Sequence, residues 1–164
     1  SDLISELLNT SRPTEIVMEK QKLHHVLEDV ITASIDRLTL KKIALKKSFD
    51  RGVSEVMADK EKLKLALLNI VINSVEAMSE TTGQLTIALQ ENNGKAVVTI
   101  SDNGCGIAEE NISRLFEPYF TQKRNGVGLG LTFTLNILQA HKAELEVTSA
   151  VGEGTTFTIR FPYV

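Results

Sequence analysis

The chain has 164 residues, which suffices for one domain with or without a short appendage. Hydrophobic residues make up 42% and charged residues 24%, an ordinary soluble composition, and no apolar run approaches the roughly 20 residues that span a bilayer. A net charge of −3, with no basic stripe among aromatics, argues against nucleic-acid and membrane partners. Cys105 is the single cysteine, which excludes an intrachain disulfide and a thiolate metal cluster and fits a reducing cytoplasmic compartment. We interpret Cys105 as a small residue between two glycines.

A short apolar pattern at helical spacing opens the chain, at Leu3, Ile4, Leu7 and Leu8. Pro13 ends this segment, and a helix of that length is marginal by itself. The first residues lack the basic start and long apolar centre of a signal peptide. We expect residues 1–13 to be the tail of a longer helix, cut from a larger protein, and residues 14–164 to form the main domain.

Periodicity predicts a helix over about Glu19–Arg37 and two strands after it. The apolar stripe of the helix is formed by Leu23, Val26, Leu27, Val30, Ile31 and Ile35. Of His24 and His25, one should flank the stripe and the other should face water. Lys42–Phe49 alternates like a half-buried strand, and Glu55–Ala58 is a second, short strand.

Asp59 is a candidate N-cap for a helix that runs to about Met78. Its broad apolar face carries Leu63, Ala66, Leu67, Ile70, Val71, Ser74 and Val75. Gln84–Gln90 and Lys95–Ser101 alternate well, and Asn92-Asn93-Gly94 between them is a strong hairpin signal.

Glu144–Ser149 and Thr155–Phe161 form a second pair of predicted strands. Between the two pairs lies an irregular stretch, Asp102–Gly130, followed by a helix to about His141. An irregular segment of this length inside a compact domain is uncommon unless it is functional.

Glycines at Gly126, Gly128 and Gly130 stand directly before the helix that we expect to start near Leu131. Glycines let the backbone approach phosphates, and a helix N-terminus favours anions. The pattern lacks the preceding strand of a dinucleotide fingerprint and the Gly-Lys-Ser/Thr of a P-loop. A flexible turn before a helix is the alternative interpretation.

Asp102, at the end of an apolar strand, offers a carboxylate that can only accept hydrogen bonds. Such an acceptor suits the exocyclic amine of adenine and disfavours the carbonyl of guanine. The alternative is a turn residue ahead of Asn103-Gly104.

Asn69 and Asn73 are four residues apart and therefore share one helix face. Asparagines in an apolar helix need partners, and an amide oxygen is a suitable ligand for Mg²⁺. The alternative is a pair of satisfied core amides. We expect Glu76 to be solvated rather than to contact a metal-bound water.

Together these elements resemble the catalytic, ATP-binding domain of two-component sensor histidine kinases, in the Bergerat (GHKL) superfamily. The matching motifs are the asparagine box Asn69–Met78, the first glycine box Asp102–Gly106, the F box Phe116–Phe120, the second glycine box Gly126–Gly130 and the closing element Gly154–Thr156. The match covers about Gln21–Pro162. Asn73–Met78 and the short lid Thr121–Asn125 look like the nitrogen-sensing branch.

The resemblance implies an α/β (α+β) two-layer sandwich, in which about three helices cover one side of a mixed sheet of about five strands. ATP would lie on the helical side beneath a lid, with Asn73 as the Mg²⁺ ligand and Asn69 and Asn73 as catalytic residues. The implied nucleotide contacts are Asp102, Gly104, Gly106, Ile107, Phe120, Lys123, Arg124, Gly126, Gly128, Leu129, Gly130, Leu131, Thr155 and Thr156. For Lys123 and Arg124, simple solvation is the alternative.

No phosphoacceptor motif of the family is present, and we interpret His24, His25 and His141 as structural or surface residues. Residues 1–13 resemble the end of the second dimerisation helix, so the accepting histidine would lie on a domain largely outside this chain. The family further implies a response-regulator receiver domain as partner and a homodimeric full-length protein, cytoplasmic or membrane-anchored.

Residue 69 separates enzyme classes within the superfamily. Its ATPases and serine kinases carry a glutamate there as general base, whereas this chain has Asn69, whose amide cannot accept the proton. A histidine kinase needs less of a base because neutral imidazole is itself the nucleophile. An ATPase or serine kinase of the superfamily, and a non-catalytic ATP-binding module, remain the alternatives.

Overall fold

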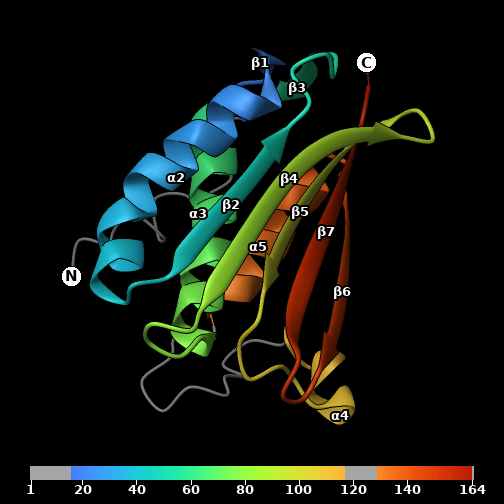
Figure 1. Cartoon of the computed structure of the whole chain (residues 1–164). Coiled ribbons are helices and arrows are strands. Elements are labelled where there is room, and N and C mark those ends of the chain that lie inside the picture. Colours follow the sequence, from blue (N-terminus) through green and yellow to red (C-terminus); the bar gives the residue numbers. More distant parts are fainter. Residues whose placement is uncertain (1–15, 117–128, 164) are drawn as a thin grey trace.

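The computed structural model describes residues 16–116 and 129–163 of the chain. One layer is a five-stranded sheet, and helices α2, α3 and α5 cover one of its faces (Figure 1). The elements are β1 (Glu19–Gln21), α2 (Leu23–Leu40), β2 (Ala44–Phe49), β3 (Val56–Ala58), α3 (Lys60–Ala77), β4 (Gln84–Asn92), β5 (Lys95–Asp102), α4 (Glu109–Ile112), α5 (Leu129–Ala140), β6 (Glu144–Ala150) and β7 (Gly154–Pro162). The expected two-layer sandwich is confirmed.

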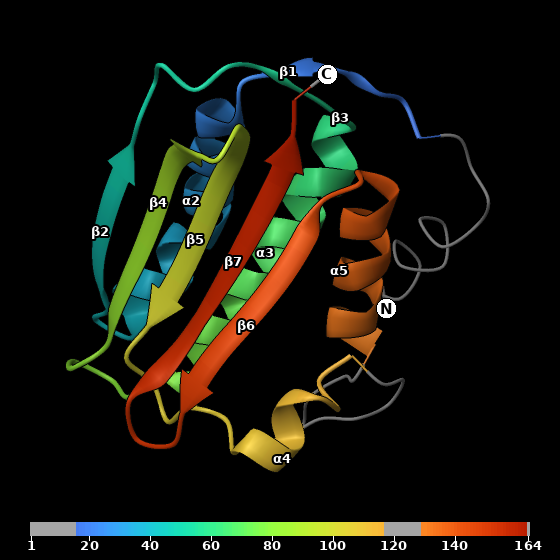
Figure 2. The same ribbon diagram turned by 90° about the vertical axis from the view of Figure 1, so that its right-hand side faces the viewer.

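The sheet has the strand order β2-β4-β5-β7-β6, which Figure 2 shows from its uncovered face. Strand β2 is parallel to β4 and the other neighbours are antiparallel, so the sheet is mixed as expected. Both predicted hairpins are present. The β4–β5 turn uses Asn93 and Gly94, at φ 54° and 75°, the left-handed conformations that this tight hairpin turn requires.

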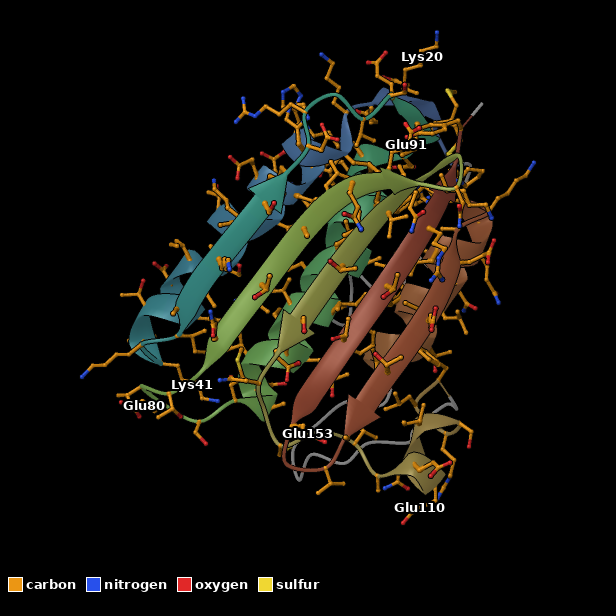
Figure 3. All side chains as sticks on the ribbon, turned by 45° about the vertical axis from the view of Figure 1, so that its right-hand side comes forward. Lys20, Lys41, Glu80, Glu91, Glu110 and Glu153 are labelled. Carbon is orange, nitrogen blue, oxygen red and sulfur yellow. The ribbon has the colours of Figure 1, made fainter. Side chains whose placement is uncertain are left out.

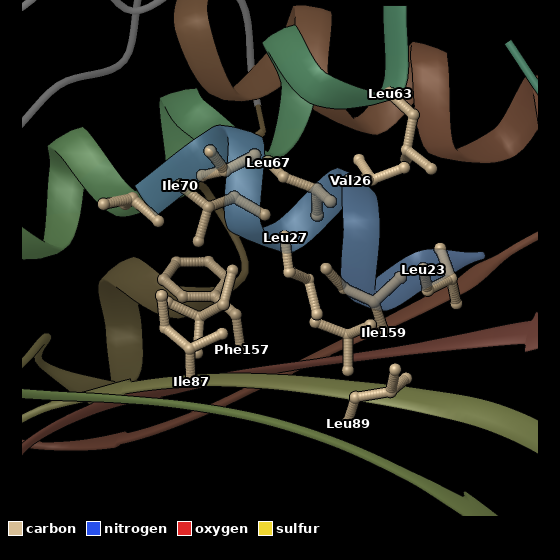
Figure 4. Close-up of a cluster of buried hydrophobic side chains, with 14 of the residues drawn as sticks. Leu23, Val26, Leu27, Leu63, Leu67, Ile70, Ile87, Leu89, Phe157 and Ile159 are labelled. Carbon is tan, nitrogen blue, oxygen red and sulfur yellow. The ribbon is translucent and has the colours of Figure 1, made fainter. Parts of the chain in front are cut away.

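The core lies between the sheet and the two helices α2 and α3 (Figure 4). Leu27 of α2 and Leu67 and Ile70 of α3 meet Ile87 and Phe157 from the sheet, and all are at most 3% exposed. Burying each such side chain contributes about 1.5–3 kcal/mol. The predicted apolar stripes therefore face the sheet and fix how the helices lie on it.

The predicted start of the first helix at Glu19 is wrong. Glu19–Gln21 is a short strand that pairs antiparallel with Val56–Ala58, and α2 begins only at Leu23. The partner strand is more than thirty residues away, so local periodicity carries no sign of this pairing. Within α2, His24 is 7% exposed and His25 is exposed, as predicted.

The other helix boundaries are close to those predicted. Asp59 caps α3, because its side chain accepts a hydrogen bond from the Lys62 amide at 3.2 Å. Helix α5 begins at Leu129, two residues before its predicted start, and α4 was not predicted because four residues show no periodicity. Among the described residues, none of the helices has the length and apolarity to cross a membrane.

Candidate functional site

The predicted motifs that the structure describes meet at one end of the molecule. Here α3 ends, β4 begins, β5 ends, β6 turns into β7 and α5 begins (Figures 1 and 2). Figure 3 shows Lys41, Glu80 and Glu153 at this end, and Lys20 and Glu91 at the opposite end. Residues that are far apart in the sequence can therefore build one site here.

Asp102 is the last residue of β5 and is only 7% exposed. Its Oδ1 accepts a hydrogen bond from the Gly104 amide at 2.8 Å. Burial raises the pKa of the Asp102 carboxyl, although the Gly104 amide, which donates to it, and the nearby Ser74 hydroxyl and Thr155 amide counteract part of this increase. Asp102 thus does shape its turn, but it is also a buried acceptor, unlike an ordinary surface turn residue.

Ser74, on α3, faces the same place and is 2% exposed. Its hydroxyl is near enough to Asp102 to influence the carboxyl pKa, yet its Oγ lies outside hydrogen-bonding geometry. In the described part of the chain, it is the one buried side-chain nitrogen or oxygen without a hydrogen bond. An unpaired buried hydroxyl costs about 1–3 kcal/mol, so a polar ligand or a bridging water at this point would relieve a real penalty.

The first glycine box is pressed against the end of α3. A Cβ on Gly104 would lie 2.5 Å from the Ala77 carbonyl oxygen, so only glycine fits, and the next amide, of Cys105, donates to that same oxygen at 3.0 Å. Gly106 adopts φ +75°, and a Cβ there would come within 2.0 Å of the Ala150 oxygen. The glycines are therefore required for the loop to fit between α3 and the β6–β7 turn.

The other side of this loop is held by the β6–β7 pair. The Gly152 amide donates to the Cys105 oxygen at 2.8 Å, and the Ile107 amide donates to Ser149 Oγ at 2.8 Å. Ser149 Oγ also lies 2.8 Å from Thr155 Oγ1. Ser149 was not predicted to take part. Its position on the inward side of β6, where Leu145 and Val147 precede it in alternation, was the available signal.

Lys41 is a second residue that the sequence reasoning missed. Its Nζ donates to the Val75 and Met78 oxygens at 2.8 and 2.7 Å and so neutralises the C-terminus of α3. That helix has no basic residue in its own last turn, and a cation there is favourable. Lys41 thereby fixes the surface on which Cys105 docks.

Asn69 and Asn73 lie on α3, one turn apart, and both are half-buried. Asn73 Nδ2 donates to the Asn69 carbonyl oxygen at 2.8 Å, so Oδ1 is the end of the Asn73 amide that can accept or ligate. They are therefore not fully buried core amides. Glu76, on the next turn, is exposed.

Helix α5 brings its first turn, Leu129 to Leu131, to the same end of the molecule. Thr132 Oγ1 donates to the Phe116 carbonyl oxygen at 2.8 Å and so ties α5 to the first residue of the predicted F box. The remaining predicted contacts in this region, Phe120, Lys123, Arg124, Gly126 and Gly128, lie outside the described residues.

Thr155 and Thr156 lie on opposite faces of β7. Thr155 is 5% exposed and faces Asp102 and Ser149, whereas Thr156 Oγ1 bonds Ser101 Oγ at 2.7 Å on the uncovered face of the sheet. Because side chains alternate along a strand, only Thr155 faces the site. The side chain of Thr156, the other threonine predicted to contact nucleotide, thus lies on the face of the sheet away from Asp102 and Ser149.

Within residues 16–116 and 129–163, no three His, Cys, Asp or Glu side chains converge as a metal cluster would require. A cation at this end would be bound through an amide oxygen such as that of Asn73, together with ligand oxygens and water, which is the usual manner of Mg²⁺. The arrangement thus offers a buried acceptor for a base, a hard oxygen for a cation and a helix N-terminus for phosphates.

Comparison with known proteins gives consistent matches. The family described as histidine kinase-, DNA gyrase B-, and HSP90-like ATPase matches residues 58–164. The signal transduction histidine-protein kinase AtoS of Escherichia coli (strain K12) is 34% identical over 161 residues, covering 98% of this chain and 26% of AtoS. Sporulation kinase C of Bacillus subtilis (strain 168) is 31% identical over 161 residues, covering 98% of this chain and 37% of that protein.

Among solved structures, the nucleotide-free catalytic domain of histidine kinase ThkA superimposes with a TM-score of 0.80 at 26% identity, over 89% of this chain and 95% of that one. This chain spans about a quarter to somewhat over a third of the length of the two sequence relatives. Residues 58–164, which match the family, contain every residue from Asn69 to Thr155 that builds the site.

Proposed function

Because this chain belongs to the family of histidine kinase-, DNA gyrase B-, and HSP90-like ATPases, we propose that it is the catalytic domain of a sensor histidine kinase. It binds ATP, as the family does. The γ-phosphoryl group would pass to a histidine on a dimerisation domain, and from there to a response-regulator aspartate. The whole protein would be a homodimer whose catalytic part works in the cytoplasm.

The observation that carries this proposal is the buried carboxylate of Asp102 beside the unpaired hydroxyl of Ser74. A carboxylate accepts from the exocyclic amine of adenine, and Ser74 adds a donor or acceptor through a water. The residues present therefore fit an adenine base. The phosphates of the bound ATP would extend along α3 toward Asn69, Asn73 and the first turn of α5.

The chain's own residues would act by positioning and by stabilising charge. Asn73 Oδ1 would hold Mg²⁺, which neutralises the phosphate oxygens when bound. The amides of the first α5 turn would orient the terminal phosphates. A neutral imidazole nitrogen of the acceptor attacks the γ-phosphorus, the bond to the β-phosphate oxygen breaks, ADP leaves and the imidazole proton goes to solvent. Asn69 is no general base, which fits an imidazole nucleophile.

The acceptor experiment tests the transfer. The chain is incubated with γ-labelled Mg·ATP alone and with a histidine kinase dimerisation domain from the same full-length protein. We expect label only on the added domain, at its histidine. Labelling of the chain when it is incubated without the added domain would contradict the proposal that its acceptor histidine lies elsewhere. Rapid phosphate release abolished by Asn69→Ala would instead identify an ATPase, and binding without any transfer a regulatory module.

The magnesium assignment has its own test. Asn73→Ala removes the proposed ligand, and we expect the Mg²⁺-dependent gain in ATP affinity to fall roughly tenfold, about 1.4 kcal/mol. Asn73→Asp keeps an oxygen ligand and should retain that gain, although it loses the bond to Asn69. Titration calorimetry of ATP with and without Mg²⁺ measures both. Equal Mg²⁺ dependence in Asn73→Ala and the unchanged protein would remove Asn73 from the metal site.

A further inference from the structure

His141 is a buried histidine whose two ring nitrogens both have partners. It is 3% exposed and follows the last residue of α5. Its Nδ1 lies 2.8 Å from the Ile137 oxygen, to which it donates, and its Nε2 accepts from the Asp59 amide at 3.0 Å. This pairing requires the neutral ring with the proton on Nδ1, because a backbone amide can only donate.

The bond to Asp59 joins the end of α5 to the start of α3. Asp59 is the N-cap of α3, and its carboxylate also accepts from the Val17 amide at 3.0 Å. The two helices pack side by side and run in opposite directions (Figure 2). His141 and Asp59 therefore form a contact at the end of this helix pair that is opposite the proposed nucleotide site.

A second contact lies seven residues along both helices. Thr134 Oγ1 lies 3.4 Å from the Ala66 oxygen. At about 1.5 Å per residue, each helix advances roughly 10 Å between the two contacts, so the axial offset between the two helices is the same at both. If this offset continues for five more residues along both helices, Leu129, the first residue of α5, lies beside Val71, between Asn69 and Asn73.

We propose that His141 is a positioning residue that sets the axial register of α5 against α3, and so holds the first turn of α5 level with Asn69 and Asn73. The inference rests on the proposed function, in which that turn binds phosphates. Apolar packing in this seam comes from Ala66, Phe133, Ile137 and Leu65. Such packing is non-directional, whereas the His141–Asp59 bond specifies one register.

Three ligands separate positioning from general stability. Adenosine reports on the Asp102 side, ATP without metal adds the phosphates, and Mg·ATP adds Asn73. In His141→Ala we expect Mg·ATP affinity to fall about tenfold, because the helix N-terminus and the metal ligand lose their alignment, while adenosine affinity changes less than about twofold. His141→Gln, whose amide oxygen can accept from Asp59, should recover most of the loss.

The matched control is His24→Ala, which removes another buried histidine, on α2, away from the α3–α5 seam. We expect it to leave the ratio of Mg·ATP to adenosine affinity unchanged. An equal loss for adenosine and Mg·ATP in His141→Ala, or no loss for either, would overturn the inference. Failure of the unchanged protein to bind Mg·ATP would instead refute the proposed function.

A measurement on the unchanged protein keeps the inference testable if His141→Ala does not fold. Long-range ¹⁵N–¹H spectra report the tautomer of each imidazole. We expect His141 to be neutral with the proton on Nδ1, and the Asp59 amide to exchange slowly. A proton on Nε2, or rapid exchange at Asp59, would show that the register bond does not form.

Discussion

The base side and the phosphate side of the proposed site are built in different ways. On the base side, Asp102 is held by contacts within a few ångströms: Gly104 bonds its carboxylate, Cys105 bonds Ala77, and Ile107 bonds Ser149. On the phosphate side, the first turn of α5 is located by the way a whole helix lies on α3, through Thr134 and His141, and by the bond from Thr132 to the Phe116 oxygen.

In the proposed site, this difference means that the two halves of a nucleotide would be recognised with different tolerances. On the base side the acceptor is held by local hydrogen bonds, so a small change there should directly alter which base is bound. The phosphate side depends on helix register, so residues up to about 18 Å away, the length of twelve helical residues, can affect it. A substitution on one side should therefore leave binding by the other side unchanged.

The largest effect is expected for Asp102→Asn. An amide presents a donor as well as an acceptor to adenine, and the charged acceptor is lost. We expect ATP affinity to fall by about 1.5–3 kcal/mol, roughly 10- to 100-fold, with much less change for GTP. Calorimetric titration of both nucleotides measures this.

The control for Asp102→Asn is the Mg²⁺ dependence of the residual binding, which should stay as in the unchanged protein, because Asn73 is untouched. Unchanged ATP affinity would reduce Asp102 to a turn residue. A parallel loss of the Mg²⁺ dependence would show that the two sides are not separable.

A moderate effect is expected for Thr132→Val, on the phosphate side. Valine keeps the shape of threonine but cannot donate to the Phe116 oxygen. We expect Mg·ATP affinity to fall roughly three- to tenfold, the usual worth of one hydrogen bond, with adenosine affinity unchanged. Thr132→Ser restores the hydroxyl and should restore binding in the same titration. If serine binds as weakly as valine, the hydroxyl is not the cause.

Local patterns were sufficient for most of the fold. The stripe through Leu27 and the one through Leu67 and Ile70 predicted two helices that do face the sheet, and Asn93-Gly94 predicted a hairpin that is present. The pairing of Glu19–Gln21 with Val56–Ala58 was missed because it depends on a distant strand. Sequence patterns predict the structural features that residues close together in the sequence determine.

The same limit applies to the residues of the site, of which only some have a local signal in the sequence. Asp102, Asn69 and Asn73 could be chosen from the sequence, since a polar residue in an apolar run needs a reason. Lys41 and His141 could not. Their partners, at Val75 and Asp59, lie 34 and 82 residues away and meet them only in the folded chain. For Ser149 the alternation along β6 gave its face, but its partner Ile107, 42 residues away, meets it only in the fold.

The smallest effect is a stability change on the base side. Burial raises the pKa of Asp102 in the folded chain above its ordinary value. The fold therefore holds the Asp102 proton more tightly than the unfolded chain does, and stability falls as pH rises from the ordinary value through the raised one. Above both pKa values the ionised, buried carboxylate is a constant cost to the ligand-free protein.

Asp102→Asn should accordingly raise the Tm of the ligand-free protein at neutral pH, although it weakens ATP binding. At this chain length each 1 kcal/mol gained appears as about 2–4 °C. The gap between the two proteins should narrow as acid protonates Asp102, and reverse at neutral pH under saturating Mg·ATP, because ligand stabilises the unchanged protein more. A ligand-free Asp102→Asn protein that melts lower at neutral pH would mean that the carboxylate stabilises the empty fold, and the base side would then be a structural turn rather than an acceptor kept ready for adenine.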